Sequence, residues 1–155
     1  MDKQEFARRV TQMQGSLYRV AASYLRGESD RLDAVAEAIA RAWEKRGTLR
    51  DEALFSTWMT RILIRVCVDM QRKQKRMTPV DTLPETPTGE DSCAALREAV
   101  DSLPQKLRTM VVLYYMEGYE VREVARIMGT TKGAVCAGLS RAREKLRSML
   151  GEEER

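Results

Sequence analysis

The residue types of this chain suit the binding of a polyanion better than they suit covalent catalysis. Basic side chains concentrate in residues 72–76 and 141–147. The chain contains no histidine, so it lacks the commonest general base and the commonest transition-metal ligand. Cys67, Cys93 and Cys136 are too far apart to form a Cys-x-x-Cys zinc or redox motif. We therefore expect lysine and arginine side chains to bind phosphates, with no enzymatic activity and no cofactor.

Residues 119–147 have the pattern of a helix-turn-helix. A short amphipathic stretch is followed by Gly129-Thr-Thr and then by a second amphipathic stretch, from about Thr131 to Arg147, with a basic end. The second helix of such a motif can enter the major groove of DNA. The pattern therefore indicates a nucleic-acid-binding module at this end of the chain.

Charge follows a block pattern. Residues 1–76 contain 16 Lys and Arg against 10 Asp and Glu, a net charge of +6, whereas residues 77–94 contain four acids and no base. Residues 95–150 have 10 bases against 6 acids, a net charge of +4, and residues 151–155 have a net charge of −2. Two cationic blocks joined by an acidic segment favour two modules on a polyanion, although solvated helix faces would produce the same pattern.

Helical periodicity runs through the first block. The spacing of apolar residues predicts helices over 3–26, 30–46 and 54–76, with a loop at 47–53. Gly27 and Gly47 are expected to stop the first two helices, and Asp30 is expected to cap the second. The predicted inner face of this second helix consists of Leu32, Val35, Ile39, Ala42 and Trp43.

The second block is also predicted to be helical. Residues 77–92 contain Pro79, Pro84 and Pro87 among polar residues, which indicates an extended or mobile linker. Ser102-Leu-Pro-Gln is expected to open a central helix as a capping box, and Gly118 to end it. The predicted fold class is all-α, with two small helical domains at 1–76 and 95–150, an acidic linker at 77–94 and an acidic tail at 151–155.

Several motifs resemble the sigma-70 family of bacterial RNA polymerase sigma factors. The segments that resemble region 2 are Asp33-Ala-Val-Ala-Glu-Ala-Ile-Ala-Arg-Ala-Trp43, Phe55-Ser-Thr-Trp58, and Arg61-Ile with the basic helix end. Those that resemble region 4 are Leu103-Pro-Gln-Lys-Leu-Arg, Glu117-Gly-Tyr, Glu123-Val-Ala, Met128-Gly and Ser140-Arg-Ala-Arg-Glu-Lys-Leu146. Two regions with an acidic linker, and neither a region 1.1 nor a region 3, are the plan of the extracytoplasmic-function (ECF) group.

The resemblance implies a function in transcription initiation without chemistry of its own. Such a factor binds core RNA polymerase through the β and β′ subunits, places promoter DNA and helps to open it. An anti-sigma factor, or a DNA-bound protein that recruits region 4, are further partners that it implies. The chain has no apolar run near the ~18 residues that span a bilayer, and its first residues do not resemble a signal peptide, so we expect a cytoplasmic protein without membrane insertion.

The resemblance also implies a role for the helix predicted at 30–46, which would dock on the polymerase clamp. The residues expected to take part are Asp33, Val35, Glu37, Ile39 and Arg41. Its mixed apolar and charged face suits a partner helix. Val35 and Ile39 are equally consistent with core positions and Trp43 fits the core better, so Glu37 and Arg41 are the stronger docking candidates.

The loop and the third helix would face the −10 promoter element. Opening a duplex requires that an extruded base and the phosphates of a single strand be held, which polar groups, aromatic rings and cations can do. The candidates are Lys45, Arg46, Thr48, Arg50, Ser56, Thr57, Arg61, Arg65, Arg72, Lys73, Lys75 and Arg76. Phe55 and Trp58 fit the buried stripe and are expected in the core.

Region 4 would read the −35 element, and here the sequence departs from its relatives. The candidate contacts are Thr130, Thr131, Lys132, Cys136, Ser140, Arg141 and Arg143. Relatives commonly have Lys-Ser-Arg where this chain has Cys136-Ala137-Gly138, which predicts weak or atypical −35 reading. The small residues would let another backbone approach closely, or would contact thymine methyl groups. Arg65 and Ala36 are further departures, since relatives usually have asparagine and glutamine there.

Two other functions fit parts of the pattern. In one, the chain is a helix-turn-helix regulator that is not a sigma factor, with residues 1–76 as a sensor or dimerisation module. In the other, it is a degenerate sigma-like adaptor recruited by a partner. The linker at 77–94 fits either a solvated spacer or an acidic mimic of a phosphate backbone in the polymerase channel.

Overall fold

The computed structural model describes residues 1–77 and 94–151. The predicted acidic linker, apart from its two end residues, and residues 152–155 of the predicted tail lie outside these ranges. The chain divides into two compact units, Met1–Leu83 and Pro84–Arg155. All regular secondary structure in the described residues is helical, so the predicted all-α class with two small helical domains is confirmed.

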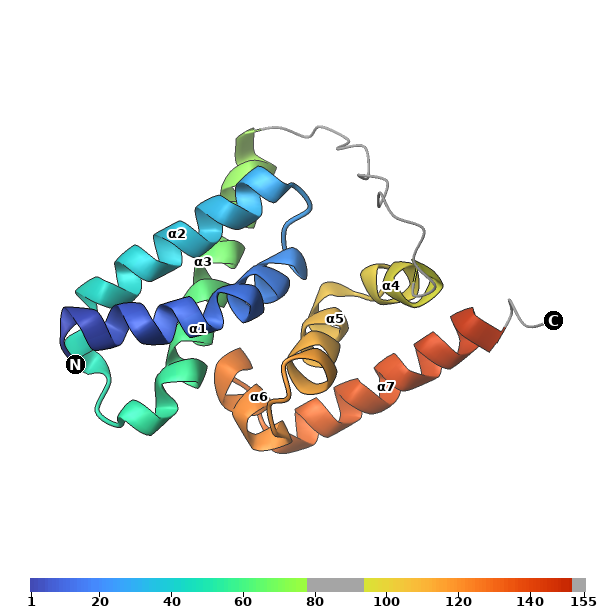
Figure 1. Cartoon of the computed structure of the whole chain (residues 1–155). Coiled ribbons are helices and arrows are strands. Elements are labelled where there is room, and N and C mark those ends of the chain that lie inside the picture. The colour runs from blue at the N-terminus through green and yellow to red at the C-terminus, as the bar shows by residue number, and fades with distance from the viewer. Residues whose placement is uncertain (78–93, 152–155) are drawn as a thin grey trace. The chain divides into compact units, whose positions relative to one another are not determined.

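The described part of unit 1, residues 1–77, forms three helices and two short 3₁₀ turns. In chain order these are α1 (Lys3–Ala22), α2 (Glu28–Glu44), the turns Arg46–Thr48 and Glu52–Leu54, and α3 (Phe55–Met77). Helices α1 and α2 lie side by side, and α3 crosses both of them (Figure 1). The core between them contains Leu17, Val20 and Ala21 from α1 and Met59, Leu63, Val66 and Cys67 from α3.

A stripe of alanines forms the inner face of α2. Ala34, Ala38 and Ala42 are fully buried, and their small side chains let α2 lie close to its neighbours. The prediction that Leu32 points inward was wrong, because its side chain is 53% exposed. The inner stripe is therefore rotated from the arc that the large apolar residues suggested.

The helix ends in unit 1 also differ from the sequence prediction. Helix α1 ends at Ala22, and Gly27 lies at the N-cap of α2 instead of closing α1. Helix α2 has no side-chain cap, since it begins at Glu28 and places Asp30 inside its first turn. There the Asp30 carboxylate accepts a hydrogen bond of 3.0 Å from Gln74 of α3, which ties the start of α2 to the end of α3.

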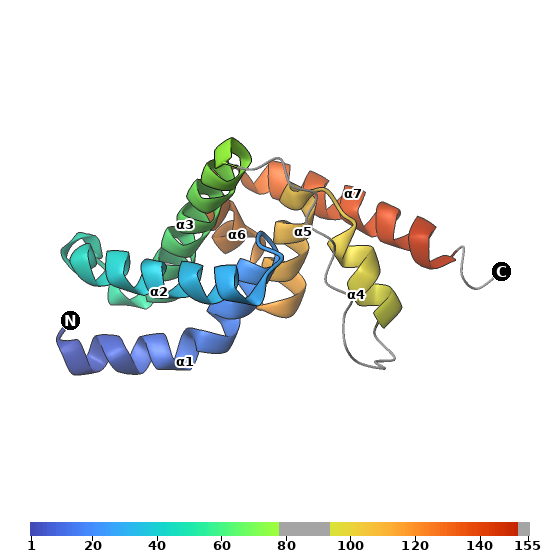
Figure 2. The same ribbon diagram turned by 90° about the horizontal axis from the view of Figure 1, so that it is seen from above.

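Residues 94–151, the part of unit 2 that the structure describes, form four helices. They are α4 (Ala94–Asp101), α5 (Gln105–Val111), α6 (Val121–Met128) and α7 (Lys132–Gly151), and a wide π turn, Val112–Met116, extends α5. Helices α4, α5 and α6 all pack on α7, the longest element of this unit, which Figure 2 shows from above. The buried residues include Leu103, Leu107, Met110, Leu113, Val124, Ile127, Val135 and Leu139.

The turn between α6 and α7 has the features of a helix-turn-helix. Gly129 ends α6 in the left-handed region, with φ of 66°, which favours glycine. Thr131 caps α7, because its hydroxyl accepts a hydrogen bond of 3.1 Å from the Ala134 amide. A capping box formed by Glu120 and Glu123 opens α6. These local signals fix the angle at which α7 leaves the turn.

Of the two predictions for the ends of the central helix, the one for its start was wrong and the one for its end is confirmed. The capping box predicted at Ser102 was wrong, since α5 begins after Pro104 with no side-chain cap and the Ser102 hydroxyl donates to the Ala99 carbonyl at 2.8 Å. The predicted stop at Gly118 is confirmed by its φ of 75° just after the π turn.

Candidate nucleic-acid interface

The exposed side of α2 combines apolar and charged side chains. Asp33 and Glu37 are exposed, whereas Val35 and Ile39 are half-buried at the edge of the core. Leu32, which sequence reasoning placed in the core, lies on this exposed side. A surface with a protruding leucine next to carboxylates suits a partner helix that offers apolar and basic side chains.

Arg41 is held in place by two carboxylates. Its guanidinium donates to Glu37 at 3.1 Å and to Asp69 of α3 at 3.2 Å. These hydrogen bonds, first that with Glu37, raise the pKa of Arg41. Arg41 therefore links α2 to α3 and is less free to bind a further anion than its neighbours.

The loop between α2 and α3 is exposed and is closed by local hydrogen bonds. Arg46 stacks on the Trp43 ring, 3.7 Å from its centroid, and donates to the Trp43 carbonyl at 2.7 Å. Thr48 donates to the Lys45 carbonyl at 2.7 Å. Arg50 is fully on the surface. Arg46 therefore stabilises the conformation of the loop, whereas the Arg50 side chain is exposed.

A cationic groove lies between the end of α2 and the start of α3. It has a volume of about 260 Å³ and is lined by Arg41, Lys45, Trp58, Arg61, Ile62 and Arg65. Trp58 is only half-buried, so the expectation that it is a core residue was only partly right. Lys45, Arg61 and Arg65 are exposed, and the described structure gives them no ion pair, so their charge is available to a ligand.

The remaining candidates on α3 fall into three groups. Arg72, Lys73, Lys75 and Arg76 are exposed at its C-terminal end. Ser56 is exposed near its start. Thr57, predicted to contact DNA, is 9% exposed and lies in the core, because it occupies the buried side of the first helical turn. Arg61, Arg65 and the basic C-terminal end therefore all lie on α3, and Arg41 and Lys45 line the groove from the end of α2.

Helix α7 presents a polar stripe to solvent. Lys132, Cys136, Ser140, Arg143 and Arg147 are exposed and follow one another at helical spacing. Arg143 donates to the Tyr115 hydroxyl at 3.0 Å, and this hydrogen bond raises the pKa of its guanidinium.

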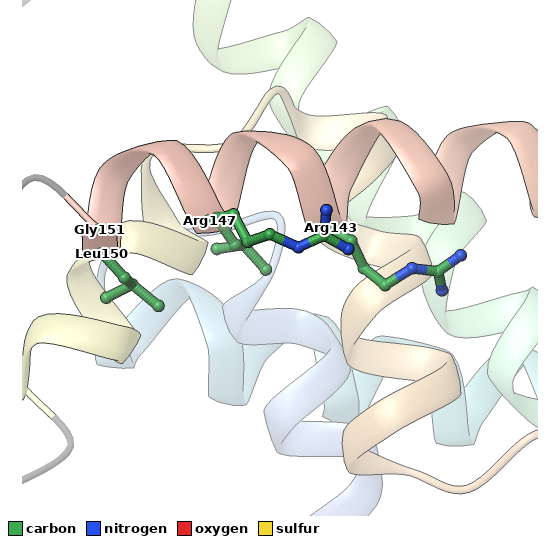
Figure 3. Close-up of a pocket in the computed structure, with 5 residues that line it drawn as sticks. Arg143, Arg147, Leu150 and Gly151 are labelled. Atoms are coloured by element: carbon green, nitrogen blue, oxygen red, sulfur yellow. The ribbon is translucent and has the colours of Figure 1, made fainter.

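Arg147 was missed by the sequence analysis, although it lies one turn beyond Arg143 on the same side of α7 (Figure 3). The two arginines line a shallow hollow of about 390 Å³ with Leu146, Leu150 and Gly151. The other candidates, Thr130, Thr131 and Arg141, lie beside the stripe at or near the surface. The recognition helix thus carries its cations mainly in its C-terminal half.

Gly138 permits a close approach to α7, which is one of the two roles that we expected for the small residues. It is buried, and a Cβ added there would lie 2.3 Å from the Met110 sulfur and 3.4 Å from a methyl carbon of Leu107. The groups that approach Gly138 are therefore side chains of α5 in the same unit. The expectation that position 138 faces DNA was wrong, while Cys136 and Ala137 do face solvent.

Comparisons with known proteins match both halves of the chain. Residues 9–77 match the model of sigma-70 region 2, and residues 93–146 match the model of sigma-70 region 4. The RNA polymerase sigma factor SigV of Bacillus subtilis is 31% identical over 150 residues, covering 94% of this chain and 90% of SigV. The ECF sigma factor SigM of Mycobacterium tuberculosis is 30% identical over 140 residues, covering 87% of this chain and 71% of SigM.

Solved structures share the fold. The sigma factor RpoE of Bartonella quintana, solved with the anti-sigma factor NepR, matches with a TM-score of 0.83 at 20% identity and covers 96% of this chain and 98% of RpoE. CnrH, solved with the cytosolic domain of CnrY, matches with a TM-score of 0.74 at 21% identity and covers 97% of this chain and 90% of CnrH. None of the helices in residues 1–77 and 94–151 combines the length and apolar character that crossing a bilayer requires.

Proposed function

We propose a division of labour between the two units of this chain, which belongs to the ECF group of the sigma-70 family of RNA polymerase sigma factors. Unit 1 docks on core polymerase and holds the opened −10 element, and unit 2 binds duplex DNA at the −35 element. The chain acts in the cytoplasm by binding, without a chemical step. Of the alternatives, a non-sigma regulator is disfavoured because a module for sensing or dimerisation would not match region 2.

The docking surface on polymerase is the exposed side of α2. Leu32 supplies an apolar anchor, and Asp33 and Glu37 flank it with negative charge. An interface with an apolar centre and a charged rim gives affinity through the former and orientation through the latter. Arg41 braces this helix against α3 through Asp69, so docking and DNA contacts share one rigid frame.

The groove beside Trp58 is the observation that carries the −10 assignment. An aromatic wall and three cations without ion pairs are the elements that bind single-stranded nucleic acid, the ring by stacking and the cations through phosphates. At about 260 Å³ the groove holds one nucleotide and is too small for a long segment. Lys45, Arg61 and Arg65 would bind the flanking phosphates, and the basic end of α3 would continue the path.

At the −35 element we propose binding that depends mostly on the DNA backbone. Lys132, Arg143 and Arg147 suit phosphates, whereas the centre of the exposed stripe carries Cys136 and Ala137. Neither side chain can make the bidentate contact with guanine that discriminates bases by about 1–3 kcal/mol. Direct reading of −35 is therefore weak, and promoter choice depends more on the −10 element or on a DNA-bound partner.

An anti-sigma factor is a further partner that we propose. RpoE, which shares the fold, was solved with the anti-sigma factor NepR, and CnrH was solved with the cytosolic domain of CnrY. In unit 2, Leu96, Tyr115 and Met116 are 45%, 52% and 50% exposed, and large apolar side chains at the surface are common at protein interfaces. An inhibitor that covers them would withhold the unit from DNA.

Run-off transcription with reconstituted polymerase tests this function. Core polymerase supplied with the full chain should start at defined promoter positions at which core alone does not start. Copurification with core but no promoter-directed transcription would favour the degenerate adaptor. Failure to bind core at all would remove the sigma assignment.

A further inference from the structure

Both ends of the loop between α2 and α3 are fixed by one aromatic side chain of α1. Phe6 packs edge-on against Trp43, the penultimate residue of α2, with ring centroids 5.2 Å apart. It packs in the same way against Phe55, the first residue of α3, at 6.0 Å. Residues 45–54 therefore begin and end at a rigid support. Between these points the loop is exposed, apart from the half-buried Leu49.

Arg9, one turn after Phe6 on α1, binds the loop itself. Its guanidinium donates to the Glu52 carbonyl at 2.8 Å and to the Glu52 carboxylate at 3.4 Å, across 43 positions of sequence. The side-chain hydrogen bonds given above for the loop, from Arg46 and Thr48, join residues three positions apart. Arg9 thus ties the loop to a distant helix, and the amino group of Met1 adds an ion pair with Glu52 at 3.8 Å.

The guanidinium of Arg9 is itself held on two other sides. Its Nε donates to Glu5 at 2.8 Å, and its central carbon lies 5.6 Å from the centre of the Phe55 ring. Hydrogen bonds from Arg8 and then from Arg9 lower the pKa of Glu5 to about 2, so this carboxylate stays ionised in ordinary buffers. A guanidinium fixed at three points holds its partner in a defined place, because its donors form a planar fork.

We propose that Arg9 is a positioning residue for promoter recognition: through Glu52 it holds the loop of residues 45–54 in the conformation that receives an extruded base of the −10 element. This proposal rests on the proposed function of unit 1, since it assigns Arg9 to the loop that would face the opened DNA. Arg9 does not itself contact the base. Its effect is to keep Lys45, Thr48 and Arg50 where the single strand passes.

The chain offers a matched control in Arg8. Arg8 and Arg9 are adjacent, both are cations of α1 and both pair with Glu5, but only Arg9 reaches Glu52. Arg8→Ala and Arg9→Ala therefore remove the same charge from the same helix and differ in the bond to the loop and in the contact with Phe55. Glu52→Gln removes one of the two Arg9 contacts and keeps the carbonyl. Arg9→Lys keeps the positive charge but loses the planar arrangement of guanidinium donors.

The first measurement is hydrogen exchange in the free, full-length chain. In Arg9→Ala, amides of residues 46–54 should exchange roughly tenfold faster, the factor expected for the loss of one charge-assisted hydrogen bond. In Arg8→Ala they should exchange at the wild-type rate. If the exchange rates of these amides are unchanged in Arg9→Ala, or rise equally in both variants, Arg9 does not hold the loop in place. This conclusion is independent of the function of the chain.

The second measurement is base preference at the −10 element, from transcription of a promoter library randomised there. Arg9→Ala should flatten the preference at one or two adjacent positions by roughly tenfold, Glu52→Gln and Arg9→Lys should have intermediate effects, and Arg8→Ala none. A mere loss of stability would lower the yield equally at all positions and would contradict positioning. If the wild type shows no base preference, the proposed function fails, while the exchange result still decides whether Arg9 holds the loop in place.

Discussion

At the scale of single residues, small side chains on α7 affect helix packing at one position and the exposed surface at two others. Gly138 lets α7 pack closely on α5, because the end of the Met110 side chain occupies the place of its missing Cβ. Cys136 and Ala137 instead leave the recognition surface without long donors. The three neighbouring residues that depart from the family pattern therefore differ in role. Gly138 serves helix packing, whereas Cys136 and Ala137 lie on the surface that we propose to face DNA.

Replacing Gly138 by arginine, the residue common in relatives, should destabilise unit 2 instead of improving DNA binding. A large charged side chain at this buried site would displace Met110 and lose its hydration, at a cost of about 2 kcal/mol or more. Ala137→Arg, on the exposed side of the same turn, should change stability by no more than about 0.5 kcal/mol. Urea unfolding followed by circular dichroism of both variants distinguishes them, and equal stability would refute the packing role.

The described cysteines should react very differently with a thiol reagent. Cys67 is buried, and burial raises the pKa of its thiol to about 12, whereas Cys136 is exposed on α7. In the native chain at pH 8, peptide mass spectrometry should find Cys136 alkylated and Cys67 protected until the protein unfolds. Rapid alkylation of native Cys67 would show that the core of unit 1 opens easily.

The raised pKa of Cys67 makes the stability of the folded chain depend on pH. The folded state keeps the Cys67 proton that the unfolded chain releases above its ordinary pKa of 9.0, so unfolding is favoured as the pH rises from there towards 12. Cys67→Ser replaces the thiol by a hydroxyl that does not ionise in this range. The decline in its stability between these pH values should be less steep than in the wild type, as measured by denaturant midpoints.

At the scale of elements, α2 and α3 each have a charged exposed surface, and hydrogen bonds between side chains join the two helices. The buried alanines of α2 bring the two helices together, and Arg41 joins Glu37 to Asp69 across them. The exposed side of α2 and the groove beside Trp58 are therefore parts of one rigid body, and substitutions at the surface can separate the functions that we propose for them.

Leu32→Ser should weaken binding to core polymerase without affecting the fold. A leucine that is 53% exposed contributes little to the core, but its burial at an interface contributes up to about 1.5–3 kcal/mol. Leu54→Ser, at a 39% exposed leucine away from this helix, serves as the control. Titration of labelled core polymerase gives the affinities, and an unchanged value for Leu32→Ser would move the docking surface elsewhere.

Trp58→Ala should weaken binding of opened promoter DNA by the holoenzyme. Stacking of a base on an aromatic ring contributes about 1–3 kcal/mol, so the affinity for DNA with a single-stranded −10 segment should fall while Trp58→Phe retains most of it. Removing one base at a time from the strand identifies the nucleotide involved. If the abasic penalty is the same in Trp58→Ala as in the wild type, the groove does not hold a base.

At the scale of the whole molecule, the sequence predicted the helices well and their faces less well. Periodicity and charge blocks suffice for two helical units, because both are local properties of the chain. The inner side of α2 was misjudged because alanines, not leucine, make the contact. The tie from Arg9 to Glu52 joins residues 43 positions apart, and no local pattern reveals it. Likewise, the fit of Gly138 against Met110 depends on tertiary packing alone.

Start-site mapping with a fully randomised promoter library tests the central claim most directly. Core polymerase reconstituted with this chain should begin transcription downstream of a shared −10 sequence, with a weaker base preference at a fixed distance upstream. The result that would contradict the account is a distribution of start sites identical to that of core polymerase alone.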